Sequence, residues 1–325
     1  MVESPFTADD LLTLEADLIA ALASQGFDVE SIKLIGLKGS GSNSTVFSVL
    51  INDVYHVLKV YREAGAYKRE IHNLRAQISL DRMFFVWPAE LHRYRYNIVV
   101  IEVPEGQEMH SSDLGPAAAK QFASCMLGLH SIRYREKGST RALEVRLRGQ
   151  MGAILAHAAD YESIDGDEIE AVIERAIRYL RRHAKSFRTS RSRVHGDPWW
   201  GNVIVANEGF YLVDWEGVKR DDYCEDLAKF RVLVDYERDS EPASFWDTEP
   251  NYDAVDHFMD DVLARYEDHF DAETNIRGRY GFYCLYFACI VFGDYYYDVK
   301  HGSVEAKNIL RSGIDLFLRY SIKGA

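Results

Sequence analysis

The sequence contains few cysteines, and those it has lie far apart. Its 325 residues include four: Cys125, Cys224, Cys284 and Cys289. A disulfide framework or a zinc knuckle requires more cysteines, or cysteines at close and regular spacing. We therefore predict that all four are reduced and structural, in keeping with the usual burial of free cysteine.

Positive charge is also scarce. Lys and Arg number 38 against 51 Asp and Glu, which gives a net charge of −13. Such a chain repels phosphate backbones and anionic membranes, so we expect neither nucleic acid nor a membrane as a partner. A cationic partner suits this charge better.

Long apolar runs are missing as well. No run approaches the roughly 20 residues that a membrane helix needs, and the acidic first ten residues lack the apolar core of a secretory signal, so we expect a cytoplasmic protein. The 47% of hydrophobic and 27% of charged residues are typical of a folded globular chain. At about 150 residues per domain, the length favours two domains.

Residues 31–103 are rich in short β-type segments. The segments IKLIGLKGSGSNSTVFSVL, VYHVLKVY and NIVVIEV mix β-branched and aromatic residues, which predicts strands. Between the second and third, residues 65–80 are helix formers with Ile71, Leu74 and Ile78 at helical spacing. We therefore predict a small sheet crossed by one helix.

After Val103 the pattern becomes mainly helical. Pro104 and Gly106 interrupt the chain there, so we place one domain at residues 1–103 and a second at residues 104–325. A short β-rich island, residues 193–218, lies among the predicted helices. These helices are residues 116–131, 143–160, 167–187, 252–270, 282–299 and 304–320.

The β-rich island carries a pattern of acid and amide side chains. Asp197 is followed five residues later by Asn202, then by an apolar hairpin, and then by Asp214. Phosphoryl transfer needs one carboxylate to orient the attacking hydroxyl, and it needs oxygen ligands for Mg²⁺. Asp197 suits the first, catalytic task, and Asn202 and Asp214 suit the second as metal ligands.

These residues resemble the aminoglycoside phosphotransferase and choline kinase superfamily. That family has His-Gly-Asp with an Asn at the same offset, as in residues 195–202, and a later Asp-Trp or Asp-Phe, as at Asp214. The resemblance runs from about residue 35 to about residue 230 and implies an α+β, two-lobed protein-kinase-like fold. A small antiparallel sheet with one helix would form the N-terminal nucleotide-binding lobe, and the C-terminal catalytic and acceptor-binding lobe would be mainly helical. ATP and Mg²⁺ are the implied cofactors.

The resemblance also implies how ATP is held. Lys59, at the end of a strand, would grip the α- and β-phosphates and pair with Glu70, although Glu63 competes for that role and a strand lysine can simply point to solvent. The glycine-containing loop would offer backbone N–H groups to phosphate, unless it is an ordinary hairpin. Ser44 replaces the third glycine of the protein-kinase loop, and the chain has no Gly-Lys-Ser/Thr sequence. The implied loop residues are Gly39, Ser40, Gly41 and Ser42.

Apolar side chains would hold the adenine between the lobes. The hinge between the lobes would lie near residues 102–106, with Glu102 and Val103 as candidate adenine contacts. Because Pro104 has no N–H, either Val103 or Glu105 would donate to the ring, or the purine is held in a less conventional way. Ordinary core packing explains the apolar candidates equally well. These candidates are Val46, Val57, Ile204 and Val213.

Three other residues have simpler interpretations. His195 is expected to be a core histidine that supports the loop. Asp226 is expected to be a structural carboxylate at a helix start, stabilised by the helix dipole and loop N–H groups. For Asp214, a turn at a strand end is the alternative to metal binding.

The acceptor is expected to be a small molecule. Protein kinases place a long activation segment ending in Ala-Pro-Glu after the metal-binding Asp, whereas about ten residues separate Asp214 from a predicted helix here. Residues 221–273 contain 18 Asp or Glu against 4 Lys or Arg, which is either a solvated acidic face or a pocket for a cation. Aromatic residues that could contact a cation or a sugar are Trp199, Trp200, Trp215, Trp246 and residues 295–297.

We therefore predict an ATP-dependent kinase for a small alcohol. An aminoglycoside-type acceptor is one interpretation, and choline, an amino sugar or another alcohol is the alternative. A nucleotide-binding regulator without catalysis and a protein kinase are further rivals. Neither the acceptor's identity nor an oligomeric state follows from these motifs.

Overall fold

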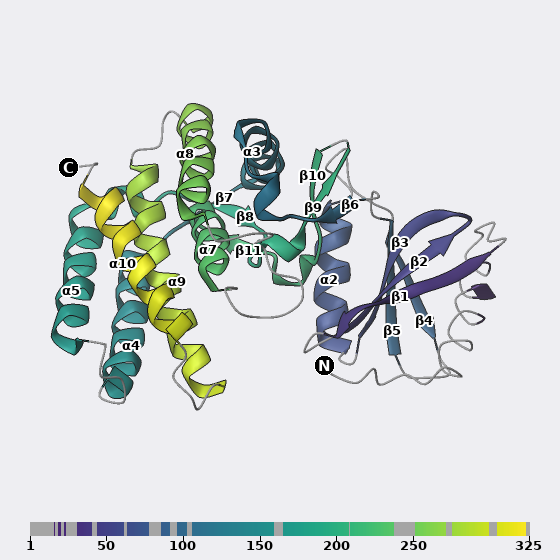
Figure 1. The fold of residues 1–325 in the computed structure, drawn as a ribbon, viewed down its shortest axis with the longest axis horizontal. Helices are drawn as coiled ribbons and strands as arrows, with labels where there is room; N and C mark the ends of the chain where they lie inside the picture. Colours follow the sequence, from purple (N-terminus) through teal and green to yellow (C-terminus); the bar gives the residue numbers. More distant parts are fainter. Residues whose placement is uncertain are drawn as a thin grey trace. The chain divides into compact units, whose positions relative to one another are not determined.

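The protein is described by a computed structural model (Figure 1). By their contacts, the residues form two compact units. The first unit is Met1–Gly106 with Asp214–Gly217, and the second is Gln107–Val213 with Val218–Ala325. The described residues are 16, 19–20, 23, 31–40, 44–61, 64–77, 86–91, 96–102, 106–158, 165–207, 209–236, 251–270, 275–298 and 304–322.

The first unit is built on a five-stranded antiparallel sheet with the order β1-β2-β3-β5-β4. A two-residue turn joins β2 to β3, and both of its residues, Asn52 and Asp53, have positive φ, as tight hairpins require. Helix α2 (Ala64–Gln77) packs on the sheet against β3, β4 and β5 (Figure 1). The strands are β1 Ile32–Ser40, β2 Ser44–Ile51, β3 Val54–Tyr61, β4 Val86–Leu91 and β5 Tyr96–Glu102.

The second unit is mainly helical. Its helices are α3 Pro116–His130, α4 Thr140–Ala158, α5 Gly166–Arg182, α6 Ala184–Phe187, α7 Tyr223–Tyr236, α8 Tyr252–His269, α9 Ile276–Asp298 and α10 Val304–Ile322. Two small sheets have the orders β10-β9-β6 and β11-β8-β7. Their strands are β6 Gly106–Glu108, β7 Arg133–Lys137, β8 Ser190–Val194, β9 Val203–Ala206, β10 Gly209–Leu212 and β11 Lys219–Asp221.

Residue patterns explain where several of these helices begin. Pro116 occupies the first turn of α3, where its missing N–H costs nothing. The side chain of Asp165 caps α5 by accepting from the N–H groups of Asp167 and Glu168, and Asn251 caps α8 through Ala254 N–H.

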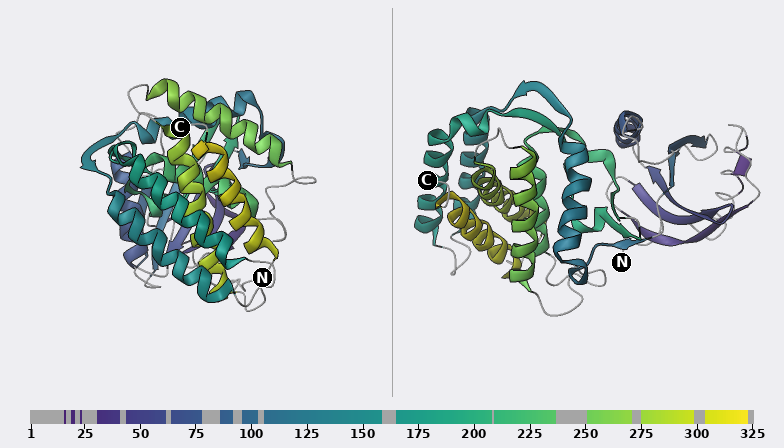
Figure 2. Two further views of the ribbon diagram at one scale, coloured as in Figure 1. Left: turned by 90° about the vertical axis from the view of Figure 1, so that its left-hand side faces the viewer. Right: turned by 90° about the horizontal axis from the view of Figure 1, so that it is seen from above.

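Close contact between α9 and α10 forms much of the core of the second unit. The helices lie side by side in all views (Figure 1 and Figure 2). At Gly313 of α10, a Cβ atom would lie 3.0 Å from the carbonyl oxygen of Cys284 on α9 and would overlap Ala288. Only a glycine therefore permits this approach of the two backbones.

Several predicted elements differ from the observed ones. The helix predicted at 167–187 is two helices, α5 and α6, because His183 has a ψ of 26° and breaks the hydrogen-bond ladder. The helix predicted from residue 282 begins at Ile276, since buried packing outweighs the low helix propensity of its glycines. The strand β7, which was not predicted, precedes the predicted helix at 143–160.

All four cysteines are free thiols, as predicted. Burial raises the pKa of Cys289 to about 12, so its thiol is unreactive. No helix among the described residues combines the length and the apolar character needed to cross a membrane.

Candidate active site

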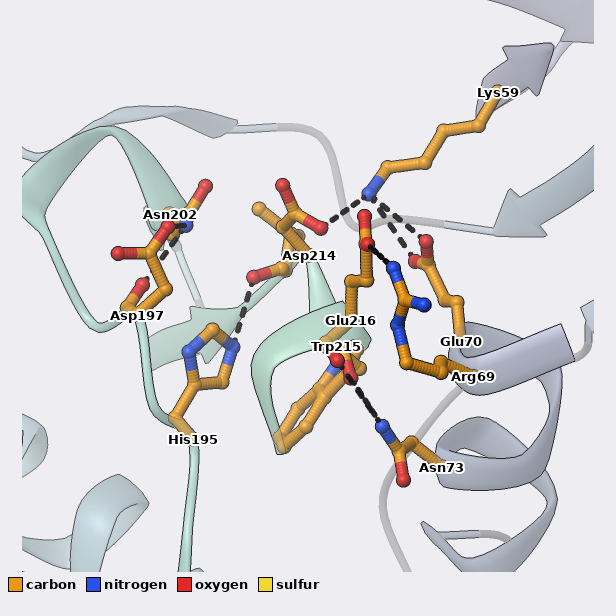
Figure 3. Close-up of polar contacts among 11 residues, drawn as sticks. Lys59, Arg69, Glu70, Asn73, His195, Asp197, Asn202, Asp214, Trp215 and Glu216 are labelled. Carbon is orange, nitrogen blue, oxygen red and sulfur yellow. Dashed lines mark hydrogen bonds and ion pairs between the residues drawn. The ribbon is translucent and has the colours of Figure 1, made fainter. Parts of the chain in front are cut away.

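Lys59 lies between two carboxylates in the first unit (Figure 3). Its Nζ atom is 3.1 Å from Glu70 Oε1 and 2.9 Å from Asp214 Oδ1. Lys59 is 5% exposed and Glu70 is fully buried, whereas the side chain of Asp214 is 42% exposed. The ion pair that the resemblance implies between Lys59 and Glu70 is therefore present, and Glu63 lies outside the described residues.

The two carboxylates keep Lys59 charged. Burial alone would lower the pKa of Lys59, but the attraction of Glu70 and Asp214 outweighs it and raises the pKa above its ordinary value. Burial also raises the pKa of Glu70, against the opposing effect of Lys59. A permanently protonated amine is what an anionic ligand such as a phosphate requires.

Helix α2 fixes the segment that contains Asp214. Asn73 donates a hydrogen bond of 2.8 Å to the carbonyl oxygen of Trp215, and Arg69 pairs with Glu216 at 2.6 Å (Figure 3). Asp214 itself has a φ of 65°, in the left-handed region that few residues other than glycine adopt. Such strain is maintained by surrounding contacts and is concentrated at functional sites.

Two predicted adenine contacts share a sheet face with Lys59. Val46 is the cross-strand partner of Lys59, and Val57 lies two residues before it on the same strand. Cross-strand partners and residues two apart point to the same face, so the amine has half-buried apolar neighbours on that face.

The described residues include only part of the predicted phosphate loop and hinge. Gly39 and Ser40 end strand β1, and Glu102 ends β5 opposite His56. Gly41, Ser42 and Val103 lie outside the described residues.

The predicted catalytic loop belongs to the second unit. It begins at His195, which is fully buried and whose Nε2 atom lies 3.0 Å from the carbonyl oxygen of Val213. Gly196 follows with a φ of 83°, which a residue with a side chain rarely adopts. His195 is thus a buried histidine bonded to the backbone, in agreement with the supporting role expected for it.

A hydrogen bond joins the acid and the amide of the motif (Figure 3). The Nδ2 atom of Asn202 donates to the carbonyl oxygen of Asp197 at 2.9 Å, with a longer contact of 3.4 Å to Asp197 Oδ2. This contact uses the amide nitrogen of Asn202 and leaves its Oδ1 oxygen for another ligand. The side chain of Asp197 is 43% exposed, so it is accessible to a substrate.

The backbone also links this loop to Asp214. Val213 N–H donates to the carbonyl oxygen of Asn202 at 2.9 Å, and Asp214 is the next residue in the chain. The predicted apolar contacts here are Ile204, which is buried in β9, and Val213, which is half-buried.

Asp226 anchors the catalytic loop from α7. Its carboxylate accepts hydrogen bonds from the N–H groups of His195 at 2.6 Å and Gly196 at 2.9 Å. The structural role expected for Asp226 is therefore confirmed, and the loop N–H groups are identified. Burial alone would raise the pKa of Asp226, but hydrogen bonding and charge from His130 lower it overall.

His130, a partner of Asp226, and Tyr266, which bonds to His130, had no signal in the sequence. His130 Nε2 lies 2.9 Å from Asp226 Oδ2, and His130 Nδ1 lies 2.6 Å from the hydroxyl of Tyr266. All three residues are buried, and they come from α3, α7 and α8. Because these helices are far apart in the sequence, no local pattern joins the three side chains.

Lys229 is the functional candidate that the sequence pattern did not identify. Its Nζ atom lies 2.7 Å from Asp197 Oδ1 and donates a hydrogen bond of 2.9 Å to the carbonyl oxygen of Gly196. One signal was available: Lys229 follows Asp226 by three residues, a spacing that places two side chains on one face of a helix.

The aromatic residues near the motif are mainly structural. Trp200 and Trp215 are buried, and Trp199 is half-buried and packs edge-on against Trp200. Trp246 and the side chains of residues 295–297 lie outside the described part of the structure.

Part of the acidic surplus of residues 221–273 is neutralised by cations from other elements. Buried Asp222 pairs with Arg279 of α9 at 3.3 Å, and Asp256 pairs with Arg231 at 3.0 Å and with Arg319 of α10. Further pairs are Asp221 with Arg191, Glu225 with Lys219, Asp260 with Arg277 and Glu267 with Arg277. These carboxylates thus have structural partners, so they give no support to a cation pocket.

The side chains of Asn202 and Asp214 are the types that Mg²⁺ prefers. Mg²⁺ often takes only one or two protein oxygens and fills its other positions with water and substrate phosphates. A carboxylate and an amide oxygen fit this pattern. Among the described residues there is no group of three or more His, Cys, Asp or Glu that could hold a metal ion.

Solved structures resemble this chain over nearly its whole length. An ethanolamine kinase of Plasmodium vivax is 13% identical with a TM-score of 0.61, over 99% of this chain and 94% of that chain. A choline/ethanolamine kinase family protein from Mesorhizobium loti is 14% identical with a TM-score of 0.61, over 96% of this chain and 98% of that chain. APH(2'')-IIa in a ternary complex with streptomycin and ATP is 17% identical with a TM-score of 0.56, over 97% of this chain and 99% of that chain. At such low identity the likeness establishes the fold alone, and it confirms the predicted α+β kinase-like fold.

Comparison of the sequence with curated proteins gives no match. A family model gives a specific one: the model described as "Phosphotransferase enzyme family" matches residues 2–271, which include both carboxylates of the motif, the amide between them and the lysine of β3. Because this match covers most of the chain, the protein belongs to the phosphotransferase enzyme family.

Proposed function

We propose that this protein transfers the γ-phosphoryl group of ATP to a hydroxyl group of a small molecule. The observation that carries the proposal is the arrangement of Asp197 and Asn202: a half-exposed carboxylate and an amide hydrogen-bonded in one loop, which α7 holds through Asp226. Such a loop supplies what phosphoryl transfer asks of a protein, namely positioning and charge neutralisation.

Each residue of the motif has a role in this proposal. Asp197 orients the acceptor hydroxyl and takes its proton as the oxygen–phosphorus bond forms and the bond to the ADP oxygen breaks. Lys59, held by Glu70, binds phosphate oxygens of ATP. Asn202 and Asp214 would hold Mg²⁺, which neutralises phosphate charge when bound.

The loop Gly39–Ser42, the valines of β2 and β3, and the hinge at Glu102 and Val103 complete the proposed nucleotide site. Ile204 and Val213 are further proposed apolar contacts of the adenine. The short connection between Asp214 and α7 supports a small acceptor, because it leaves no room for a peptide-docking segment.

Two acceptor classes are proposed. The fold likeness to APH(2'')-IIa in complex with streptomycin favours an aminoglycoside-type amino sugar, and the likeness to ethanolamine and choline/ethanolamine kinases favours a small amino alcohol. Both classes are cations, which agrees with the net charge of −13.

Transfer of label from γ-³²P-ATP tests the proposal. The chain would be incubated with Mg²⁺ and with streptomycin, gentamicin, choline, ethanolamine, an amino sugar, neutral sugars and a generic protein substrate. We expect a phosphorylated small alcohol and no labelled protein. ATP binding without transfer to any acceptor would indicate a regulator, and labelling of protein alone would indicate a protein kinase.

Two variants separate the proposed roles. Asp197→Asn should lower kcat by about 10²- to 10⁴-fold while ATP binding is retained, because it removes the proton acceptor. Asp214→Asn should instead weaken the binding of ATP in the presence of Mg²⁺, measured by calorimetry. Native turnover by the Asp197 variant would refute the proposal.

A further inference from the structure

Helix α7 binds the catalytic loop through two side chains of opposite charge. Asp226 accepts from the N–H groups of His195 and Gly196. Three residues later, Lys229 donates to the carbonyl oxygen of Gly196 and pairs with Asp197. One helix therefore binds both the N–H group and the carbonyl oxygen of Gly196.

The contact of Lys229 with Asp197 goes beyond what loop anchoring requires. The carbonyl oxygen of Gly196, at 2.9 Å, takes one of the three donors of the ammonium, and the same nitrogen lies 2.7 Å from Asp197 Oδ1. Many exposed ion pairs contribute little to stability. Lys229, however, is only 26% exposed and is fixed by a second bond, so the pair is geometrically defined.

The two oxygens of Asp197 are held unequally. Oδ1 makes the short contact with Lys229, whereas the contact of Oδ2 with Asn202 is 3.4 Å, longer than an ordinary N–H···O hydrogen bond. A carboxylate with one oxygen tied keeps a single orientation. The loosely held Oδ2 is then the atom that can accept a proton.

We propose that Lys229 is a positioning residue for phosphoryl transfer: it holds the Asp197 carboxylate through Oδ1 so that Oδ2 faces the acceptor hydroxyl. This inference rests on the proposed function. In the step it supports, the acceptor O–H bond breaks, the proton moves to Asp197 Oδ2, the acceptor oxygen bonds to phosphorus, and the bond from phosphorus to the ADP oxygen breaks.

The test is a set of full-length variants assayed for γ-³²P-ATP turnover with Mg²⁺, with water and with the acceptor panel. Lys229→Met should lower kcat by about 100-fold, the cost of a small misplacement of a catalytic group, and leave the KM for ATP unchanged. Lys229→Arg should recover part of the loss because it keeps the charge. Lys120→Met, on the exposed side of α3, removes the same charge and should behave as the native chain.

A double variant distinguishes positioning from an independent role. If Lys229 acts through Asp197, the combination of Lys229→Met with Asp197→Asn should be no slower than Asp197→Asn alone. Equal thermal unfolding midpoints for Lys229→Met and Lys120→Met should accompany this result.

Three results would overturn the inference. The first is a native kcat in Lys229→Met. The second is a double variant whose kcat lies below that of Asp197→Asn by the same factor by which Lys229→Met lowers the native kcat. The third is a loss of kcat in Lys229→Met that a lowered unfolding midpoint fully explains. Absence of ATP turnover in the native chain with water and with every acceptor would overturn the proposed function itself, and this inference with it.

Discussion

The two carboxylate partners of Lys59 differ in how much they depend on it. Glu70 is fully buried, so without the ammonium it would be an unpaired charge in the interior. Asp214, with its side chain 42% exposed, can be solvated by water instead. The ion pair of Lys59 with Glu70 is therefore the permanent one, and the contact with Asp214 is the one that can be exchanged.

Replacement of Lys59 tests this difference through stability. Lys59→Met should lower the free energy of unfolding by about 3–5 kcal/mol, because it leaves Glu70 buried without a partner. The double variant Lys59→Met/Glu70→Met should regain most of that loss, since apolar residues replace the whole buried pair. Urea unfolding followed by circular dichroism measures both, and equal stability of the single and double variants would contradict this account.

At the scale of single elements, the N-terminal turn of α7 determines the shape of the catalytic loop. Asp226 is the shared acceptor for two loop N–H groups and for His130. A neutral amide presents an N–H group as well as an oxygen, so it cannot accept from all of these donors.

Asp226→Asn should therefore loosen the loop. We expect a loss of about 2–3 kcal/mol in unfolding free energy, since bonds to a charged acceptor are among the stronger ones. Faster hydrogen exchange at the amides of His195 and Gly196 should localise the effect. Asp268→Asn, at an exposed position of α8, is the matched control and should change neither quantity. Unchanged exchange in the Asp226 variant would show that the loop does not depend on this carboxylate.

The contact of α9 with α10 depends on Gly313. Gly313→Ala should destabilise the protein by about 1–3 kcal/mol, because the added methyl group meets the backbone of α9. Gly128→Ala is the matched control: it places the same methyl group within α3 where no atom lies within 4 Å, and it should stabilise by about 0.5–1 kcal/mol. Thermal unfolding should show opposite shifts, and shifts of the same sign would contradict this packing.

The sequence predicted the contacts between residues that are close together in the chain, and it did not predict the contacts between distant elements. The offset of Asn202 from Asp197 and the hairpin before Asp214 are local patterns, so the hydrogen bond between the first two is a consequence of one turn. Lys229 and His130 reach the loop from other elements, and no spacing in the sequence reports that. Their contacts depend on tertiary packing.

Helices and strands, too, were predicted where the sequence carries a local signal and were missed where it does not. The break between α5 and α6 at His183 has neither proline nor glycine to mark it. Strand β7, with the sequence RYREK, has no apolar alternation, and β4 contains Pro88, which weakens a strand pattern. Pairing with neighbouring strands determines both.

At the scale of the whole molecule, ion pairs neutralise some of the surplus acidic residues. The count of charges in residues 221–273 suggested a free acidic surface or a cation pocket. The structure pairs several of the described carboxylates with Arg and Lys of β8, β11, α7, α9 and α10. The pairs of Asp221 with Arg191, Asp222 with Arg279 and Asp256 with Arg319 join elements that are distant in the sequence, so the charge of this segment contributes to the fold of the second unit.

One of these carboxylates should make stability depend on pH. Burial raises the pKa of Glu225 from 4.5 to about 8, against the attraction of Lys219. Because the folded chain holds this proton more tightly than the unfolded chain, its contribution to stability is complete below about pH 4.5 and is lost as pH rises through about 8.

Glu225→Gln replaces the titrating carboxyl group with a neutral amide, so a comparison with the native chain isolates the effect of this titration on stability. Relative to the variant, the native chain should lose unfolding free energy steadily between about pH 5 and pH 8, and the difference should become constant above that range. Urea unfolding at intervals across pH 5–9 measures the two curves. Glu136→Gln, at an exposed carboxylate of β7, should give a curve parallel to that of the native chain. If the Glu225→Gln curve is also parallel, the carboxylate is ionised across the whole range, and the ion pair with Lys219 outweighs the cost of its burial.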